Sequence, residues 1–148
     1  MNLLFNKSHY RSLDPKGRLV LPQEYRDALQ PLDPGGRFVL TGDQGRLVAY
    51  TLADWEETRR RLTAIKRPSQ ALGRFMSKFL GLAEEVAPDA QGRVRLSQPL
   101  MRAAGLHKDV VLVGMGWKFE VWDQARFEQL ETEDVSAELD ALGVDISL

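Results

Sequence analysis

The feature that most constrains the fold of this chain is an internal repeat. Residues 13–23 read Leu-Asp-Pro-Lys-Gly-Arg-Leu-Val-Leu-Pro-Gln, and residues 88–98, which lie 75 positions later, read Pro-Asp-Ala-Gln-Gly-Arg-Val-Arg-Leu-Ser-Gln. Both segments contain an Asp, two variable residues, a Gly-Arg pair and then apolar residues at alternating positions. Self-similarity of this kind indicates a duplicated structural unit.

The similarity continues beyond the Gly-Arg pair. Val-Leu-Thr-Gly at 39–42 matches Val-Leu-Val-Gly at 111–114, which lies 72 positions later. Residues 50–55 align with residues 122–127 at the same spacing. The change of three residues in the spacing falls at 31–36, which is rich in Pro and Gly and therefore predicts a loop. We predict two copies of one small domain.

Each copy predicts the same order of secondary structure. Alternating apolar residues after the Gly-Arg pair favour a half-buried strand. A short helix follows, which in the second copy begins near Ser97 or Gln98 and stops at Gly105, and a hairpin comes next. The predicted strands are 18–21, 38–41 and 47–50 in the first copy and 93–96, 110–113 and 119–122 in the second, with helices at 23–29 and 99–104.

Two further helices are predicted between the copies. Thr51 and Asp54 resemble a capping box at the start of a helix that runs until Pro68. Ser69 then begins a second helix with an apolar stripe, which we expect to be buried in the core or against another subunit. The stripe consists of Leu72, Phe75, Met76 and Phe79.

Composition excludes several classes of function. The 148 residues contain no Cys and two His, so thiolate chemistry is excluded and a metal site is not expected. No apolar run approaches the roughly 20 residues that a membrane-spanning helix needs, and the first residues lack the pattern of a secretory signal. We expect a cytoplasmic protein with no membrane partner, no cofactor and no small-molecule substrate.

Charge is distributed unevenly along the chain. The formal net charge is −1, yet residues 127–148 contain seven acidic residues and no Lys or Arg. The remaining 126 residues hold 20 Lys and Arg against 14 acidic residues, which gives a net charge of +6. A basic body with an acidic tail is compatible with contacts to phosphate groups but does not establish them.

The repeated motif does not fit an active site. Asp14 and Asp89 resemble the two carboxylates that share a proton in aspartic proteases. Each is followed four residues later by an Arg, whose charge keeps a carboxylate ionised and prevents the sharing. The motif also lacks the residues of a phosphate-binding P-loop. We therefore expect no enzymatic activity.

Binding of nucleic acid explains the motif better. An Arg beside a Gly turn presents a planar set of donors that suits phosphate oxygens or the O6 and N7 atoms of guanine. We expect Arg18 and Arg93 to contact DNA. Lys16 adds a charge for phosphate, and Gln91, in the matching position, can contact a base edge.

The other repeated residues are expected to shape the loops. Asp14 and Asp89 can brace the guanidinium groups before DNA arrives, and Gly17 and Gly92 permit the turns. The alternative is that each Asp and Arg closes a surface turn as a salt bridge. Residues 43–47 read Asp-Gln-Gly-Arg-Leu and show that a similar string also occurs in a hairpin. Repetition of the whole strand and helix context favours binding.

In these motifs the chain resembles the MraZ family of bacterial transcriptional regulators, whose duplicated domain belongs to the AbrB-like swapped-hairpin superfamily. The resemblance runs from about Tyr10 to Phe127. It depends on both Gly-Arg motifs together with the Val-Gly and Phe-Glu-Val-Trp segments. The residues that carry it are 10–22, 89–93, 104–106 and 110–123.

The resemblance implies an α/β mixed fold of tandem duplicated AbrB-like swapped-hairpin β-barrel units with short helices, assembled into a ring-shaped homo-oligomer. It implies binding of double-stranded DNA at tandem promoter boxes and repression of the division and cell-wall gene cluster, including the regulator's own gene, with association to the nucleoid. The predicted segments are a first repeat at 1–67, a linking helix at 68–86, a second repeat at 87–130 and an acidic C-terminal tail at 131–148.

The resemblance also bears on individual residues. The DNA contacts of the family map to Arg18 and Arg93, with Lys16 as a helper. The second motif departs from the family pattern, because Ala90 stands where many relatives have a basic residue and Ser97 stands where many have Pro. We therefore expect the second loop to carry less charge than the first.

Other interpretations remain open. The chain can be a ring-forming structural or protein-interaction module whose loops face another protein, or an antitoxin-like repressor, although such proteins usually carry one copy of the unit. A second basic cluster, at Arg59, Arg60 and Arg61, has a simpler interpretation. Pairs at i,i+4 spacing, from Glu56 to Arg60 and from Glu57 to Arg61, predict a solvated helix face.

Overall fold

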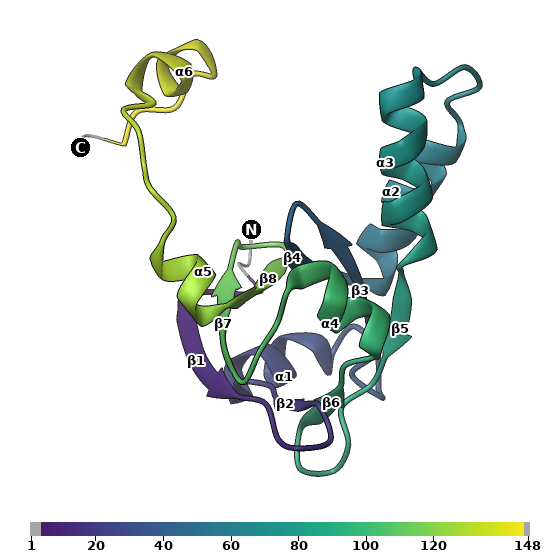
Figure 1. Cartoon of the computed structure of the whole chain (residues 1–148), viewed down its shortest axis with the longest axis vertical. Coiled ribbons are helices and arrows are strands. Elements are labelled where there is room, and N and C mark those ends of the chain that lie inside the picture. The colour runs from purple at the N-terminus through teal and green to yellow at the C-terminus, as the bar shows by residue number, and fades with distance from the viewer. Residues whose placement is uncertain (1–3, 147–148) are drawn as a thin grey trace.

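The computed structural model describes residues 4–146 of the chain. A body of two antiparallel sheets lies at the centre, a pair of helices projects from one side, and a short C-terminal helix stands apart on the other (Figure 1). Within that range the strands are β1 (Ser8–Ser12), β2 (Arg18–Val20), β3 (Phe38–Asp43), β4 (Arg46–Thr51), β5 (Glu84–Val86), β6 (Arg93–Arg95), β7 (Asp109–Gly114) and β8 (Phe119–Asp123). The helices are α1 (Gln23–Leu29), α2 (Leu52–Thr63), α3 (Gln70–Gly81), α4 (Gln98–Ala104), α5 (Gln124–Glu128) and α6 (Ser136–Ala141).

The larger sheet has the strand order β1-β7-β8-β4-β3-β5, and all neighbours are antiparallel. Both predicted hairpins are confirmed, with strands that extend one or two residues beyond the predicted ends. The outer strands pair across the repeats: Tyr10 in β1 lies opposite Val111, and the equivalent residue Glu85 in β5 lies opposite Val39. The strand that precedes each Gly-Arg pair therefore completes the hairpin of the other repeat. Within segment 68–86, which was predicted as a linking helix, only residues 70–81 are helical and residues 84–86 form β5.

The strands that begin at the arginines of the two Gly-Arg pairs form a separate ribbon. β2 and β6 are antiparallel, with Leu19 opposite Val94 at the centre and Arg18 opposite Arg95 beside them. Just beyond the strands, the N–H of Leu21 donates to the carbonyl of Gly92, and the N–H of Leu96 donates to the carbonyl of Gly17, both at 2.9 Å. Each repeat thus forms the same hydrogen bond to the glycine of the other. The two loops therefore come together at one end of the body (Figure 1).

The two short helices lie at or within one residue of their predicted bounds, and the predicted caps of α4 are confirmed. α1 spans the predicted residues, and α4 begins one residue earlier than predicted. The Ser97 hydroxyl accepts a hydrogen bond from the N–H of Leu100 (3.4 Å), and Gly105 ends α4 in the left-handed conformation with a φ of 61°. These contacts satisfy backbone groups that a helix leaves free at its ends.

The prediction that α2 continues to Pro68 is wrong. The cap itself is confirmed, because the Thr51 hydroxyl accepts a hydrogen bond from the N–H of Asp54 (3.2 Å). The helix nevertheless ends at Thr63. The chain needs the following residues to reverse direction before the Ser69 hydroxyl caps α3, and a proline keeps the residue before it out of the helical conformation.

The main core lies between the larger sheet, the ribbon, α1 and α4. Tyr25 of α1 is fully buried, and its hydroxyl donates to the carbonyl of Lys7 (3.0 Å), so its polar end is satisfied. Burial raises the pKa of Tyr25 to about 12. The buried residues of this cluster include Phe5, Leu19, Leu40, Val94, Leu112 and Phe119.

The other face of the sheet is covered only in part. Val48 and Tyr50 of β4 point away from the main core and pack with Phe79 of α3. The predicted apolar stripe is thus buried at Phe79, whereas Phe75 remains 37% exposed. No helix formed by residues 4–146 has the length and apolar character needed to cross a membrane.

Candidate nucleic-acid interface

Asp14 organises the first Gly-Arg loop. Its Oδ1 accepts hydrogen bonds from the backbone N–H groups of Lys16 (2.9 Å) and Arg18 (2.8 Å), and its Oδ2 accepts from Arg18 Nε (2.5 Å). Gly17 has a φ of 75°, a conformation that strains residues with a side chain. The contact with Nε fixes the base of the Arg18 guanidinium and leaves both terminal nitrogens without a partner within residues 4–146.

The second loop repeats this geometry and adds one contact. Asp89 Oδ1 accepts from the backbone N–H groups of Gln91 and Arg93, both at 2.9 Å, and Oδ2 accepts from Arg93 Nε at 2.8 Å. Gly92 has a φ of 78°. In addition, Arg93 Nη2 donates to Gln91 Oε1 (3.0 Å). Gln91 Oε1 accepts within the loop, and the amide N–H groups of Gln91 have no partner within residues 4–146, so they can donate to a base edge.

Both Asp carboxylates stay ionised at neutral pH. The backbone N–H of Arg18, followed by its side chain, lowers the pKa of Asp14, and the same groups of Arg93 lower the pKa of Asp89. A carboxyl group that holds or shares a proton is therefore not available in either loop.

The outer face of the β2–β6 ribbon carries an excess of positive charge. Leu19 and Val94 are buried, so their neighbours along each strand point outward. On this outer face Arg18 lies directly opposite Arg95, and Arg93 shares the face. Like charges in opposed positions destabilise a sheet, and Arg95 forms no ion pair within the part of the chain that the structure describes. An anion bound at this face would relieve the repulsion.

A residue from the opposite repeat covers the glycine of each loop. Met101 of α4 lies against Gly17, where an added Cβ would be 3.4 Å from its Sδ. In the matching place Arg26 of α1 lies against Gly92, where an added Cβ would be 2.7 Å from its Nη1. Arg26 thus brings a guanidinium to the loop that has no lysine. It was not among the predicted contact residues, although the repeat places it in register with Met101.

A basic cleft adjoins the first loop. It has a volume of about 820 Å³, and its lining includes Lys16, Arg95 and Lys108 together with Asp14. Residues from both repeats therefore face the same space. Three cations against one carboxylate, which is itself paired with Arg18, make this cleft favourable for an anion.

A third Asp and Arg pair with the same spacing lies in another loop and differs in its contacts. Asp33 is 7% exposed and accepts hydrogen bonds from Arg37 Nε (3.1 Å) and Nη2 (2.8 Å). Arg37 Nη1 donates to Glu85 of β5 (3.0 Å). Hydrogen bonds from Arg37 lower the pKa of Asp33 to about 2. All three nitrogens of Arg37 are engaged, so this pair closes a turn.

The arginines of α2 are neutralised on the helix surface. Arg59 pairs with Glu56, whereas Arg60 and Arg61 both pair with Glu57. The predicted pair of Glu56 with Arg60 is wrong, because Arg60 Nη2 reaches the carboxylate three residues before it, at 2.7 Å. Both spacings place side chains on the same helix face. The interpretation as a solvated face is unaffected.

Known proteins resemble the chain over nearly its whole length. The model of the MraZ protein family matches residues 79–142, which include the second Gly-Arg loop. The transcriptional regulator MraZ of Nitratidesulfovibrio vulgaris (strain Miyazaki F) is 45% identical over 99% of this chain and 100% of the relative. The chain belongs to the MraZ family. The transcriptional regulators MraZ of Oleidesulfovibrio alaskensis and Acidovorax sp. (strain JS42) are 46% and 39% identical, each over 97% of this chain and 99% of the relative.

Membership of the MraZ family confirms the resemblance inferred from the repeated motifs. MraZ is not a family of enzymes, and the relatives are named as transcriptional regulators. The expectation that this chain has no enzymatic activity is therefore confirmed by its family.

Proposed function

We propose that this MraZ-family protein is a transcriptional regulator that binds specific sequences of double-stranded DNA through its Gly-Arg loops. The observation that carries this proposal is the outer face of the β2–β6 ribbon, where Arg18 and Arg95 stand opposite each other. Guanidinium groups in this arrangement gain a partner when a phosphate or a guanine approaches. The names of the relatives support the same function.

The shape of the interface suggests how DNA is bound. A two-stranded antiparallel ribbon fits the major groove of B-form DNA. From that position Arg18 and Arg93 can direct terminal nitrogens at O6 and N7 of guanine, while Lys16 and Arg26 meet phosphates at the edges of the groove. Gln91 can donate from its amide group to a base or a phosphate.

The remaining motif residues position these contacts. Asp14 and Asp89 hold Nε of each arginine, so fewer rotamers are lost when DNA binds. Gly17 and Gly92 permit the turns and leave room for the side chains of the opposite repeat. We assign no DNA contact to these four residues.

The finer features implied by the resemblance are part of the proposal. Exchange of β1 and β5 between the repeats supports AbrB-like swapped-hairpin units. We propose the segments 1–67, 68–86, 87–130 and 131–148, a ring-shaped homo-oligomer, and repression of the division and cell-wall gene cluster, including the regulator's own gene. A function at bacterial promoters would place the chain in the cytoplasm, at the nucleoid.

The salt dependence of binding tests whether the loops meet phosphates. Each neutralised phosphate contributes about −0.9 to the slope of log affinity against log salt concentration. We expect a steep negative slope for a duplex taken from the region upstream of the protein's own gene, and a slope about 0.9 shallower for Lys16→Ala. A flat response for the wild-type protein would favour the protein-interaction module instead.

The spacing of boxes tests the multivalent part of the proposal. One loop offers few contacts, but linked loops on a ring can raise overall affinity by roughly 10²- to 10⁴-fold. Loops that meet one face of DNA require boxes about 10 to 10.5 base pairs apart. We expect tight binding to boxes at this spacing and weak binding to a single box or to boxes offset by half a turn. Equal affinity for all three duplexes would contradict the proposal.

A further inference from the structure

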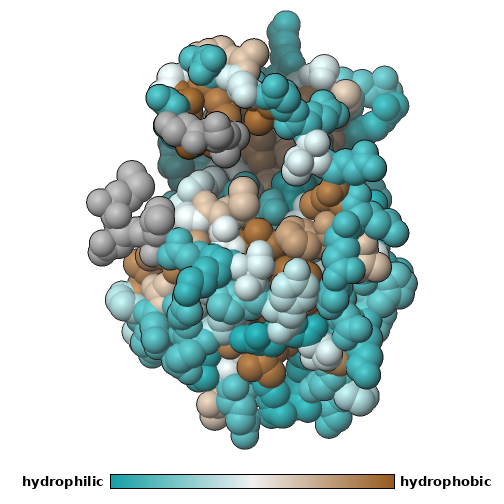
Figure 2. Space-filling model, turned by 90° about the vertical axis from the view of Figure 1, so that its left-hand side faces the viewer, coloured by the Kyte–Doolittle hydropathy of each residue, from teal (hydrophilic) through white to brown (hydrophobic). Residues whose placement is uncertain are grey.

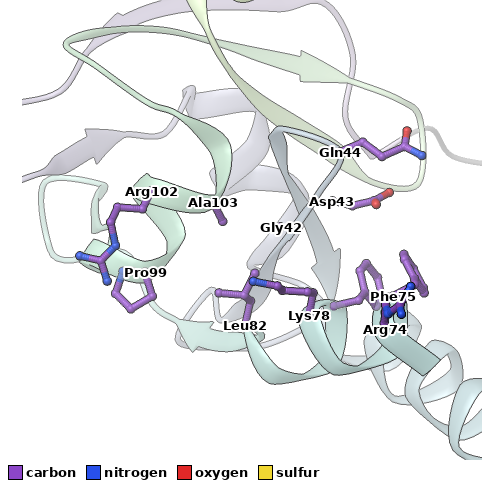
Figure 3. A pocket seen from close by; sticks show the side chains of 11 residues that line it. Gly42, Asp43, Gln44, Arg74, Phe75, Lys78, Leu82, Pro99, Arg102 and Ala103 are labelled. Carbon is purple, nitrogen blue, oxygen red and sulfur yellow. The ribbon is translucent and has the colours of Figure 1, made fainter. Parts of the chain in front are cut away.

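A groove between α3, α4 and the turn of the first hairpin combines an apolar floor with basic edges. Its volume is about 710 Å³. Phe75 of α3 and Leu82, the residue that follows α3, line one side and α4 lines the other (Figure 3). Phe79 of α3 also belongs to the lining. Gly42 lets α4 approach β3 closely, because an added Cβ would be 3.1 Å from the Cβ of Ala103.

Three cations surround this apolar floor. Arg74 and Lys78 extend from α3, and Arg102 extends from α4 on the far side (Figure 3). None of the three side chains forms an ion pair within residues 4–146. The acidic residue of the lining, Asp43, lies 3.8 Å from Arg46. The groove therefore suits a segment that is apolar on one face and acidic on the other.

The C-terminal segment of this chain has that character. No Lys or Arg follows Arg126, and the acidic residues of the segment include Glu131, Glu133, Asp134, Glu138 and Asp140. Val135, Leu139 and Leu142 recur at i, i+4 and i+7 around α6, which places them on one face. Val135 and Leu142 are 47% and 69% exposed.

α6 stands apart from the body (Figure 1), and hydrogen bonds within the segment define the end of the helix. The N–H of Gly143 donates to the carbonyl of Asp140 (3.0 Å), and the N–H of Val144 donates to the carbonyl of Leu139 (2.9 Å). This pair of hydrogen bonds, with Gly143 at a φ of 74°, is a Schellman motif that ends the helix. Figure 2 shows the face of the molecule on the side of α6, where apolar residues lie among hydrophilic ones in the upper part. Val135 and Leu142 are therefore free to pack against another surface.

We propose that the C-terminal segment 131–146 of one chain docks in the α3–α4 groove of a second copy of the same chain. The apolar face of α6 would cover Phe75 and Leu82, and its acidic residues would meet Arg74, Lys78 and Arg102. Charge complementarity favours this occupant, because the segment is the most acidic part of the chain and the groove presents cations without acidic partners.

The placement of the two surfaces favours a second copy over the same chain. α6 and α3 stand on opposite sides of the body (Figure 1). A contact between different surfaces of identical subunits is heterologous, and it closes into a ring when the rotation between subunits permits. The inference therefore rests on the ring assembly proposed above and assigns the contact that holds it.

Solution mass of the full chain tests the inference. We compare the wild-type protein with a chain that ends at residue 130, with the groove variant Lys78→Glu/Arg102→Glu, and with Arg61→Glu, a matched charge reversal on α2 outside the groove. Light scattering is expected to show an oligomer for the wild-type protein and for Arg61→Glu, and monomers for the other two. Wild-type mass in both the truncated and the groove variant would overturn the inference, as would a monomeric wild-type protein.

A mixing experiment separates docking on a second copy from docking within one chain. The truncated chain keeps an intact groove, and the groove variant keeps an intact C-terminal segment. Mixed together, the two monomers are expected to form a one-to-one complex; no complex in the mixture would overturn the inference. Affinity for a single DNA box, which does not depend on the groove, is expected to stay at the wild-type value in both. Loss of assembly with retained single-box binding thus supports the inference, whereas DNA binding that is missing in all proteins contradicts the proposed function alone.

Discussion

The two Gly-Arg loops have the same backbone but different sources of charge. In both, an Asp accepts two backbone N–H groups and the Nε of an Arg, and a glycine adopts a positive φ. The first loop has Lys16 within it and the neutral Met101 above its glycine, whereas the second has Gln91 within it and Arg26 above its glycine. Each loop therefore has two cations. In the first loop both belong to the same repeat, whereas in the second loop Arg26 comes from the other repeat.

This comparison separates two roles of the repeated residues. The shared Asp, Gly and Arg determine the turn and the direction of the guanidinium, so the backbone is repeated. The variable positions determine how many donors remain free. Both terminal nitrogens of Arg18 lack a partner within residues 4–146, whereas Nη2 of Arg93 donates a hydrogen bond to Gln91. The two loops are thus similar in shape but differ in the number of hydrogen-bond donors that remain free.

Loss of the central arginines should have the largest effect. We expect Arg18→Ala to weaken binding of the specific duplex by about 5- to 150-fold relative to a scrambled duplex, since a bidentate guanine contact is worth about 1 to 3 kcal/mol. Arg93→Ala should weaken it similarly or somewhat less, because one of its terminal nitrogens is already engaged. Titration of both duplexes at one salt concentration measures the two ratios. A clearly larger loss for Arg93→Ala would reverse the ranking of the loops.

Removal of the Arg26 side chain should have an intermediate effect. We expect Arg26→Ala to weaken binding to all duplexes alike and to make the salt slope about 0.9 shallower, as expected for one lost phosphate contact. Met101→Ala is the matched control in the other repeat, and it should leave the slope unchanged. Equal slopes for the two variants would show that Arg26 only packs against Gly92.

Conversion of the second loop into the first should have the smallest effect. Gln91→Lys adds a charge in the position of Lys16 and releases Arg93 Nη2, so we expect a salt slope steeper by about 0.9 and a modest gain in affinity. The reverse change, Lys16→Gln, should make the slope shallower by the same amount. The sharpest contrary result is a loss of affinity in Gln91→Lys, which would mean that Gln91 is needed to aim Arg93.

Much of the fold could be predicted from the sequence because the relevant signals are local. The hairpins and α1 follow from alternating or helical patterns of apolar residues. The ends of α4 follow from Ser97 and Gly105, whose types match the caps they form. The bracing of each arginine could be expected from an Asp four residues earlier in a glycine turn.

Other features depend on partners far along the chain and could not be predicted in this way. β5 has three residues, and β1 carries polar residues without an apolar alternation, so hydrogen bonds to β3 and β7 decide their conformation. The position of Arg26 beside Gly92 depends on how the repeats pack. The pair of Asp33 and Arg37 repeats the spacing of the motif, and only its contact with Glu85 shows that it closes a turn.

That third pair provides the most direct test of the central claim, which is that the Gly-Arg loops are shaped to bind DNA. Arg18→Ala and Arg37→Ala remove the same side chain from the same Asp and Arg spacing, but the first guanidinium has free nitrogens and the second has none. We would measure affinity for the in-phase promoter duplex and the thermal midpoint for both variants. The account predicts that Arg18→Ala loses specific binding with a nearly unchanged midpoint, whereas Arg37→Ala lowers the midpoint and keeps the affinity of its folded fraction. If Arg18→Ala instead lowers the midpoint and its folded fraction still binds the duplex as tightly as the wild-type protein, the loop closes a turn and the claim is contradicted.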